Sequence, residues 1–223
     1  IRALAMLEQE GVIKYDLVFR KTDPVIDHDF TSLTRWHRRF KQAGILGQDP
    51  ERYDGLGFGN ISERLDEFCF LISGTQTGHL VNLAPADYSL VTSADVSRNR
   101  IEAKGQVRPS SEALTHAAVY ALDANIRFVF HVHSPDIWNH RAVLGLPQTG
   151  ADIDYGTVEM ANDMKRLYQQ EAFHNIKVLA MAGHEDGIVG FGCTGDEAGE
   201  AIMSLLTNLG VKSVSADFTA EYF

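Results

Sequence analysis

A short apolar stretch that ends in two histidines constrains the fold of this chain more than any other segment. Residues 128–133 are Phe, Val, Phe, His, Val and His. Aromatic and β-branched residues favour a β-strand, and alternate side chains of a strand point to the same face. His131 and His133 therefore share one face, with Val132 on the other. Two neighbouring imidazoles at a strand end suit a divalent metal ion. The alternative is a pair of hydrogen-bonded histidines at the rim of a core.

The length and the charge of the chain narrow its class. Its 223 residues are enough for one sizeable core and predict one domain. The net charge of −10 argues against a nucleic-acid-binding surface, which is normally basic. No apolar run reaches the roughly 18 residues of a membrane span. The two cysteines, Cys69 and Cys193, form no Cys-x-x-Cys motif, so we expect free thiols, a buried one at Cys69, and a cytoplasmic protein.

Hydrophobic periodicity predicts a mixture of helices and strands. Helices are expected over residues 31–43, 112–122, 135–144, 157–170 and 196–209. Strands are expected over residues 11–19, 67–73, 80–83, 88–92, 128–133, 177–181 and 188–191. The cluster of strands between residues 67 and 92 favours a mostly antiparallel sheet flanked by helices, in a single α/β (α+β) domain. Residues 1–30 carry weaker patterns and are interpreted as an N-terminal extension packed on a domain of residues 31–223.

Two glycine-rich loops and one helix start are candidates for an anion site. Three glycines precede Asn60, and residues 74–78 combine two glycines with two threonines. Glycine lets the backbone come close to a ligand, although glycine-rich turns between strands explain these segments equally well. Ser110 and Ser111 stand where a helix begins, and either can cap it. Free amides at a helix N-terminus bind phosphate, which makes both serines candidates for an anion site.

Glu112 and His184 complete the candidate chemistry. Glu112 is expected in the first helical turn, where a carboxylate either complements the helix dipole or acts as an acid/base beside a metal. His184 follows the apolar strand of residues 177–181. Three histidines at one edge of a sheet with an open position are typical of a catalytic zinc. The other six histidines (28, 37, 79, 116, 140 and 174) are expected to serve surface or packing roles.

Five short motifs occur in an order that resembles the class II aldolase/adducin family. They are Gly59-Asn60-Ile61-Ser62, Thr75-Gln76-Thr77-Gly78, Pro109-Ser110-Ser111-Glu112, His131-Val132-His133-Ser134, and His184 with Gly187. The resemblance extends over residues 33–210. Members of this family include fuculose-phosphate aldolase and ribulose-phosphate 4-epimerase. The resemblance implies a single α/β domain with a central antiparallel sheet, often assembled as a homotetramer.

The resemblance also implies a metal-dependent lyase. A divalent metal, usually Zn²⁺, would be held by His131, His133 and His184, with Glu112 as the catalytic acid/base. The phosphate of a small-molecule substrate, usually a phosphorylated sugar, would be bound by Asn60, Thr77, Gly78, Ser110 and Ser111. The implied reaction of carbohydrate metabolism is the reversible aldol cleavage of a C–C bond in a hydroxy-ketone through a metal-stabilised enediolate. Alternatives are sugar-phosphate epimerisation or dehydration, a non-catalytic adducin-like scaffold, and a zinc-water hydrolase.

Several features of the chain differ from the family pattern. His184 is followed by Glu185, Asp186 and only then by Gly187, whereas glycine commonly follows this histidine directly. Gln76 stands where proline is common. Residues 1–30 match no segment of the family, and Tyr222 is a weak candidate for its C-terminal catalytic tyrosine. These differences bear on the substrate and the reaction more than on the metal.

Overall fold

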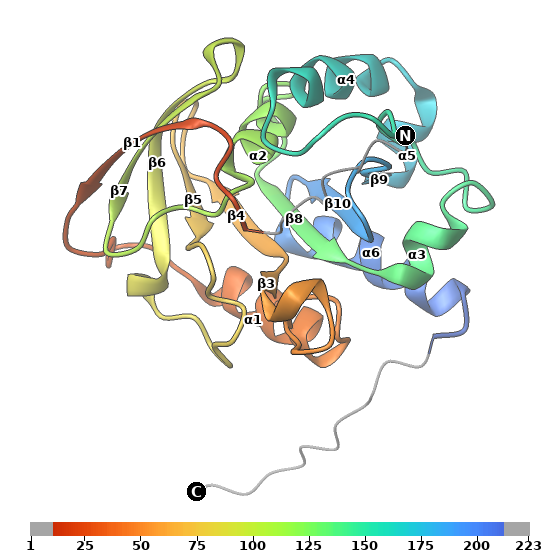
Figure 1. Cartoon of the computed structure of the whole chain (residues 1–223), viewed down its shortest axis with the longest axis horizontal. Coiled ribbons are helices and arrows are strands. Elements are labelled where there is room, and N and C mark those ends of the chain that lie inside the picture. The colour runs from red at the N-terminus through yellow and green to blue at the C-terminus, as the bar shows by residue number, and fades with distance from the viewer. Residues whose placement is uncertain (1–10, 212–223) are drawn as a thin grey trace, which may run out of the picture.

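An eight-stranded sheet runs through the molecule, which is described for residues 11–211 by a computed structural model (Figure 1). Its strands are β1 (Asp16–Lys21), β4 (Asn60–Arg64), β5 (Phe70–Ser73), β6 (Tyr88–Asp95), β7 (Arg100–Gly105), β8 (Phe128–His133), β9 (Val178–Ala180) and β10 (Gly187–Gly192). A separate two-stranded sheet consists of β2 (Gly47–Gln48) and β3 (Gly57–Phe58). The α-helices are α1 (Thr31–Gln42), α2 (Ala113–Tyr120), α3 (Pro135–His140), α4 (Val158–Tyr168), α5 (Glu171–Ile176) and α6 (Gly195–Asn208).

The strand order of the large sheet is β1-β7-β6-β5-β4-β8-β10-β9. Every neighbouring pair is antiparallel except β1 and β7, which run parallel. β8 lies between β4 and β10, and all of its residues are buried. The chain is therefore a mixed α/β domain with one mostly antiparallel sheet, which confirms the predicted fold class.

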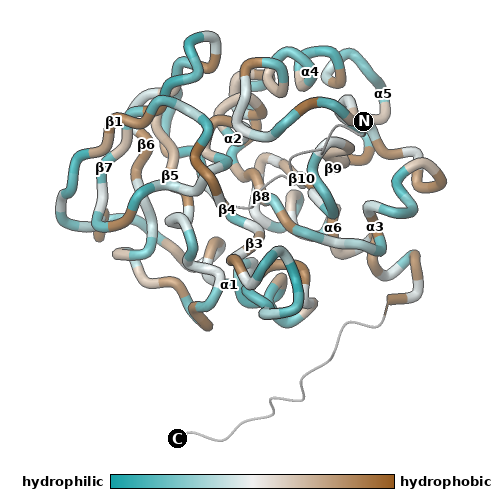
Figure 2. Tube along the Cα trace, in the orientation of Figure 1, coloured by the Kyte–Doolittle hydropathy of each residue, from teal (hydrophilic) through white to brown (hydrophobic). Residues whose placement is uncertain are grey.

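Helices cover both faces of the sheet. In Figure 1, α2, α4 and α5 lie on one side of it, and α1, α3 and α6 lie on the other. Val129 of β8 belongs to the core under α2 and α4, whereas Phe130 and Val132 belong to the core under α1 and α6. Figure 2 shows hydrophobic segments in the central strands and hydrophilic ones along the outer loops. Because side chains alternate along a strand, His131 and His133 face the same side as Val129.

Three local predictions are wrong. Residues 80–83 form no strand, because the Leu80 amide donates to the Thr77 carbonyl in a turn and Val81 is 72% exposed. Glu112, and not a serine, occupies the N-cap position of α2, although Ser110 Oγ accepts from the Glu112 amide at 3.3 Å. Cys69 is half-buried rather than buried, since β5 begins only at Phe70.

The sequence patterns also fail to predict β7 and α5. Buried and half-buried residues alternate along β7, as in a strand with one face on the core. Ile101 is its only large apolar residue, so the hydrophobic periodicity of its sequence is weak. The helix predicted over residues 157–170 ends at Tyr168, and α5 follows it almost at once. β2, β3 and β4 also fall outside the predicted strands, and the ends of the remaining elements shift by a few residues, which is the usual error of pattern reasoning.

Part of the segment 11–30 belongs to the large sheet. β1 pairs with β7 over its whole length, from Asp16 opposite Arg100 to Lys21 opposite Gly105. The domain boundary at residue 30 stays a prediction, and Tyr222 lies outside the described residues. Within residues 11–211, no helix combines the length and the hydrophobicity needed to cross a membrane.

Candidate metal centre and anion pocket

The register of β8 fixes two of the three histidines. His131 lies opposite Asn60 of β4 and Val189 of β10, and His133 lies opposite Gly187. Hydrogen bonds to the neighbouring strands fix the backbone of β8. The two histidine side chains therefore leave this backbone at fixed positions on one face of the sheet. Their ring centroids are 4.8 Å apart.

His184 reaches the same place from the tight loop between β9 and β10. Its amide donates to the Met181 carbonyl, and its own carbonyl accepts from the Gly187 amide. The His184 ring centroid lies 5.3 Å from that of His131 and 4.8 Å from that of His133. A Cβ at Gly187 would lie 2.6 Å from the His184 ring, so this turn needs glycine. The loop thus closes the third side of the histidine cluster.

Glu112 brings a carboxylate into contact with the histidines. It is fully buried at the N-cap of α2, and its Oε1 lies 2.9 Å from His131 Nε2 and 3.9 Å from His184 Nε2. The contact with His131 is close but is not aligned as a hydrogen bond, whereas Asn60 Nδ2 donates to the same oxygen at 3.2 Å. Burial raises the pKa of Glu112, but the facing His131 outweighs this effect and holds the pKa below its usual value.

The four side chains fit a divalent metal. One potential ligand atom from each of Glu112, His131, His133 and His184 lies within 4.8 Å of the others, and all four residues are buried. Ligation requires neutral imidazoles, and burial, together with the nearby His184, holds the pKa of His133 well below its usual value. Glu112 Oε2 is buried without a hydrogen-bond partner among residues 11–211. Because an unsatisfied buried oxygen is unfavourable, a bound cation would stabilise this arrangement.

A separate pocket lies among the predicted anion-site residues. It has a volume of about 20 Å³ and is lined by both glycine-rich loops and by the start of α2. All of the residues expected to bind phosphate line it, namely Asn60, Thr77, Gly78, Ser110 and Ser111. The structure therefore brings these residues together, although the ligand that they bind stays a prediction.

Gln76 narrows this pocket. Its Oε1 accepts from the Gly57 amide at 3.1 Å, so a side chain of the protein uses a donor that an anion could use. A volume of this size holds only about one water molecule. Gln76 has a φ of 56°, a conformation that proline cannot adopt. The loop therefore has a different backbone from one with proline at this position.

The sequence reasoning missed two neighbours of the histidines. Tyr53 donates to Asp186 Oδ2 at 2.6 Å, and its ring centroid lies 4.6 Å from that of His133. Tyr155 packs its ring against His184, with centroids 4.9 Å apart. No pattern in the sequence links either tyrosine to a histidine, because both contacts depend on tertiary structure. Of the two acids after His184, Asp186 is held by Tyr53 and Glu185 is exposed.

Comparisons with known proteins identify the family of the chain. The sequence model of the class II aldolase and adducin N-terminal domain matches residues 49–209. The chain belongs to the class II aldolase/adducin family. No protein of curated function matches it significantly.

Solved structures of the family share the fold at low sequence identity. L-fuculose-1-phosphate aldolase from Thermus thermophilus has a TM-score of 0.59 at 16% identity, covering 82% of this chain and 91% of that one. A sugar-phosphate aldolase from Thermotoga maritima has a TM-score of 0.58 at 16% identity, with coverages of 80% and 90%. YgbL from Escherichia coli has a TM-score of 0.58 at 21% identity, with coverages of 85% and 90%. Family membership and the buried cluster together indicate a metal-dependent enzyme.

Proposed function

We propose that this class II aldolase family member is a lyase that reversibly cleaves a C–C bond in a hydroxy-ketone, with a sugar phosphate as its substrate. The observation that carries the proposal is the buried group of Glu112, His131, His133 and His184, whose ligand atoms lie within 4.8 Å of one another. A divalent metal held there, for which Zn²⁺ is our choice, would supply Lewis-acid stabilisation of negative charge on the substrate oxygens.

Glu112 is the proposed acid/base. Its carboxylate stands against His131, and its second oxygen has no hydrogen-bond partner among the described residues. Glu112 is ionised at neutral pH, as a proton acceptor must be. Asn60 donates to Oε1 and so fixes the orientation of the carboxylate.

The anion pocket supports a phosphorylated substrate. Glycines, threonines and serines line it, and hydroxyls and backbone amides of such residues hold phosphate groups in many proteins. This arrangement would let a chain with a net charge of −10 bind an anion without a cluster of basic residues. The distal phosphate would then orient the hydroxy-ketone end of the substrate towards Glu112.

The substitution Glu112→Gln tests the proposal. It keeps the shape of the side chain and removes the proton-accepting charge, so we expect turnover to fall by roughly 100- to 10,000-fold. Exchange of the proton next to the carbonyl of a bound ketose phosphate, followed by NMR in deuterated water, should fall in parallel. The matched control is Glu185→Gln, which changes an exposed acid beside His184. Exchange at the wild-type rate in Glu112→Gln would exclude Glu112 as the base.

We further propose that the protein is cytoplasmic and forms a homotetramer. The two free cysteines are consistent with a reducing compartment, and the tetramer is the assembly that the family resemblance implies. Light scattering of the purified protein measures the assembly directly. A monomer of 24.7 kDa at micromolar concentration would contradict it.

A further inference from the structure

His184 differs from the other two histidines in how it is supported. His131 and His133 belong to β8, which has a hydrogen-bonded strand on each side. His184 lies in a loop, between the end of β9 and the start of β10. A loop residue depends on side-chain packing for its orientation, and metal ligands must be oriented correctly to bind. The structure should therefore contain a residue that positions this ring.

Tyr155 is in the right place for this role. It lies in the loop before α4, is fully buried, and packs against His184 at a centroid separation of 4.9 Å and an interplanar angle of 57°. On its C-terminal side, the Gly156 amide donates to Thr115 Oγ1 at 3.1 Å, which ties the loop to α2. Thr157 then caps α4 by accepting from the Met160 amide.

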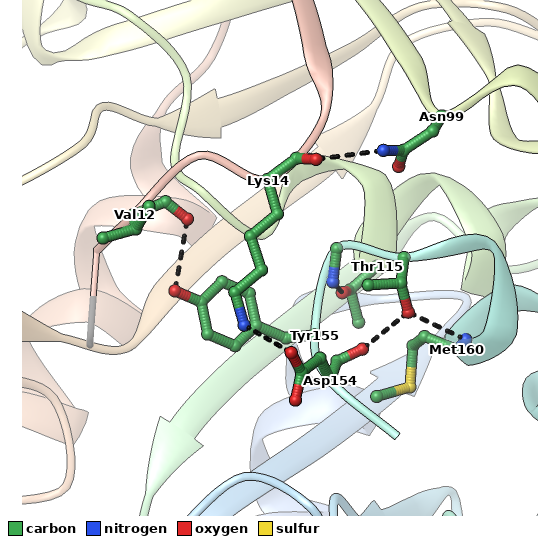
Figure 3. A network of polar contacts seen from close by, with 9 residues as sticks. Val12, Lys14, Asn99, Thr115, Asp154, Tyr155 and Met160 are labelled. Carbon is green, nitrogen blue, oxygen red and sulfur yellow. Dashed lines mark hydrogen bonds and ion pairs between the residues drawn. The ribbon is translucent and has the colours of Figure 1, made fainter. Parts of the chain in front are cut away.

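Tyr155 also contacts residues 11–15, which we call the N-terminal strap (Figure 3). The Tyr155 hydroxyl donates to the Val12 carbonyl at 3.2 Å. Lys14 Nζ lies 4.2 Å from the centre of the Tyr155 ring and 3.1 Å from Asp154 Oδ2. A cation over an aromatic face stabilises the pair. The strap thus contacts both the hydroxyl and the ring of Tyr155.

The strap is itself anchored to the body of the protein. Asn99 Nδ2 donates to the Lys14 carbonyl at 2.9 Å. Tyr15 is buried, and its hydroxyl donates to the Ser110 carbonyl at 2.7 Å, beside the anion pocket. The family match begins only at residue 49, so the strap lies outside the matched segment. The contacts between the strap and Tyr155 therefore involve residues that lie outside the family match.

We propose that Tyr155, held by the N-terminal strap, is a positioning residue for His184. The strap keeps the tyrosine ring against the imidazole, and the ring keeps the imidazole in the orientation that a metal requires. The inference rests on the metal site of the proposed function. Loss of an outer partner of a ligand typically lowers metal affinity by roughly 10- to 100-fold, and the same effect is expected here.

Metal affinity of purified variants tests the inference. We expect Tyr155→Leu, which removes the ring, to weaken Zn²⁺ binding by roughly 10- to 100-fold in a competition with a chromophoric chelator. Tyr155→Phe keeps the ring and should restore affinity to within a few-fold of the wild type. Tyr168→Leu is the matched control, because Tyr168 packs against His174 at 4.7 Å, away from the histidine cluster. This control should bind like the wild type.

A double-mutant cycle separates positioning from general destabilisation. In a His184→Ala background, Tyr155→Leu should have no further effect on affinity, because the ring that it positions is gone. Bound Co²⁺ gives a second readout, since its visible spectrum reports ligand geometry and should differ between Tyr155→Leu and the wild type at saturation. Wild-type affinity in Tyr155→Leu, or an equal loss in both backgrounds, would overturn the inference. If the wild type itself bound no metal, the proposed function would fail first.

Discussion

The metal centre and the anion pocket are neighbours that share the start of α2, yet they are built in opposite ways. Every potential ligand of the metal centre is an ionisable side chain, and all four are buried. None of the described residues that line the anion pocket has an ionisable side chain. The first site depends on which side chains β8, the β9–β10 loop and the start of α2 present, whereas the second depends on how closely the loops approach one another.

This difference predicts which changes each site tolerates. A site made from ionisable side chains fails when a side chain is removed or protonated. A pocket lined by backbone groups and small residues fails when a side chain is added. The two sites should therefore respond to different substitutions and to different solution conditions.

The largest expected effect is the loss of metal from His131→Ala and from His133→Ala. Each removes a ligand, so the affinity should fall by more than the roughly 10- to 100-fold typical of losing an outer partner. Elemental analysis of protein purified without chelator measures the result. His140→Ala changes an exposed histidine and should leave the metal content unchanged. Full metal content in either β8 variant would place the metal elsewhere.

Addition of one methyl group should damage the anion pocket instead. A Cβ at Gly78 would lie 2.1 Å from the Gly47 carbonyl oxygen, so Gly78→Ala forces the loops apart. Overpacking of this kind destabilises the folded protein by about 1–3 kcal/mol, and the separation of the loops should also lower the affinity for inorganic phosphate. Calorimetry of zinc-free protein measures it, so that the metal centre contributes nothing.

The matched control for Gly78→Ala is Gly47→Ala. A Cβ at Gly47 would meet only the tip of the Phe58 ring, at 3.9 Å, so this variant adds the same methyl group to the facing segment without a clash. Phosphate affinity should stay within about twofold of the wild type, since no pocket group moves. Equal losses in both variants would mean that the phosphate binds somewhere other than between these loops.

The smallest expected effect is a shift in pH dependence. An ordinary histidine protonates at a pH of about 6.5, and protonation competes with the metal. Because burial and the neighbouring imidazole hold the pKa of His133 well below that value, metal should be retained as the pH falls through 6.5. Metal content after dialysis at pH 4–8 measures the midpoint. A midpoint at or above 6.5 would contradict the low pKa.

Much of the metal centre could be predicted because it depends on strand periodicity. A period of two places His131 and His133 on one face regardless of what surrounds β8. His184 is a candidate because it follows an apolar strand and Glu112 because it stands at a helix start, and the order of the short motifs groups both with the two histidines. The same resemblance groups the residues of the anion pocket. From the sequence alone, a turn between strands explains each glycine-rich loop equally well.

The rest required tertiary structure. The packing of Tyr155 on His184 joins residues from two loops, and the strap that holds Tyr155 comes from a segment with no recognisable pattern. β7 escaped prediction because Ala103 and Gly105 on its buried side are too small to give a clear alternation. Gln76 was recognised as unusual, but its φ and its bond to Gly57 could not be read from its identity.

The parallel pairing of β1 with β7 has a consequence for the synthesis of the chain. Asp16 and Arg100 are 84 residues apart, so β1 leaves the ribosome long before its partner exists. At ordinary elongation rates this delay is on the order of 10 s. During that time β1 has no strand to join, and its exposed edge is open to chaperones or to other nascent chains. The strap of residues 11–15 directly precedes β1, and it can take its final position only once β7 is in place. The contact of Tyr155 with Val12 forms later still, because the two residues are 143 positions apart in the chain.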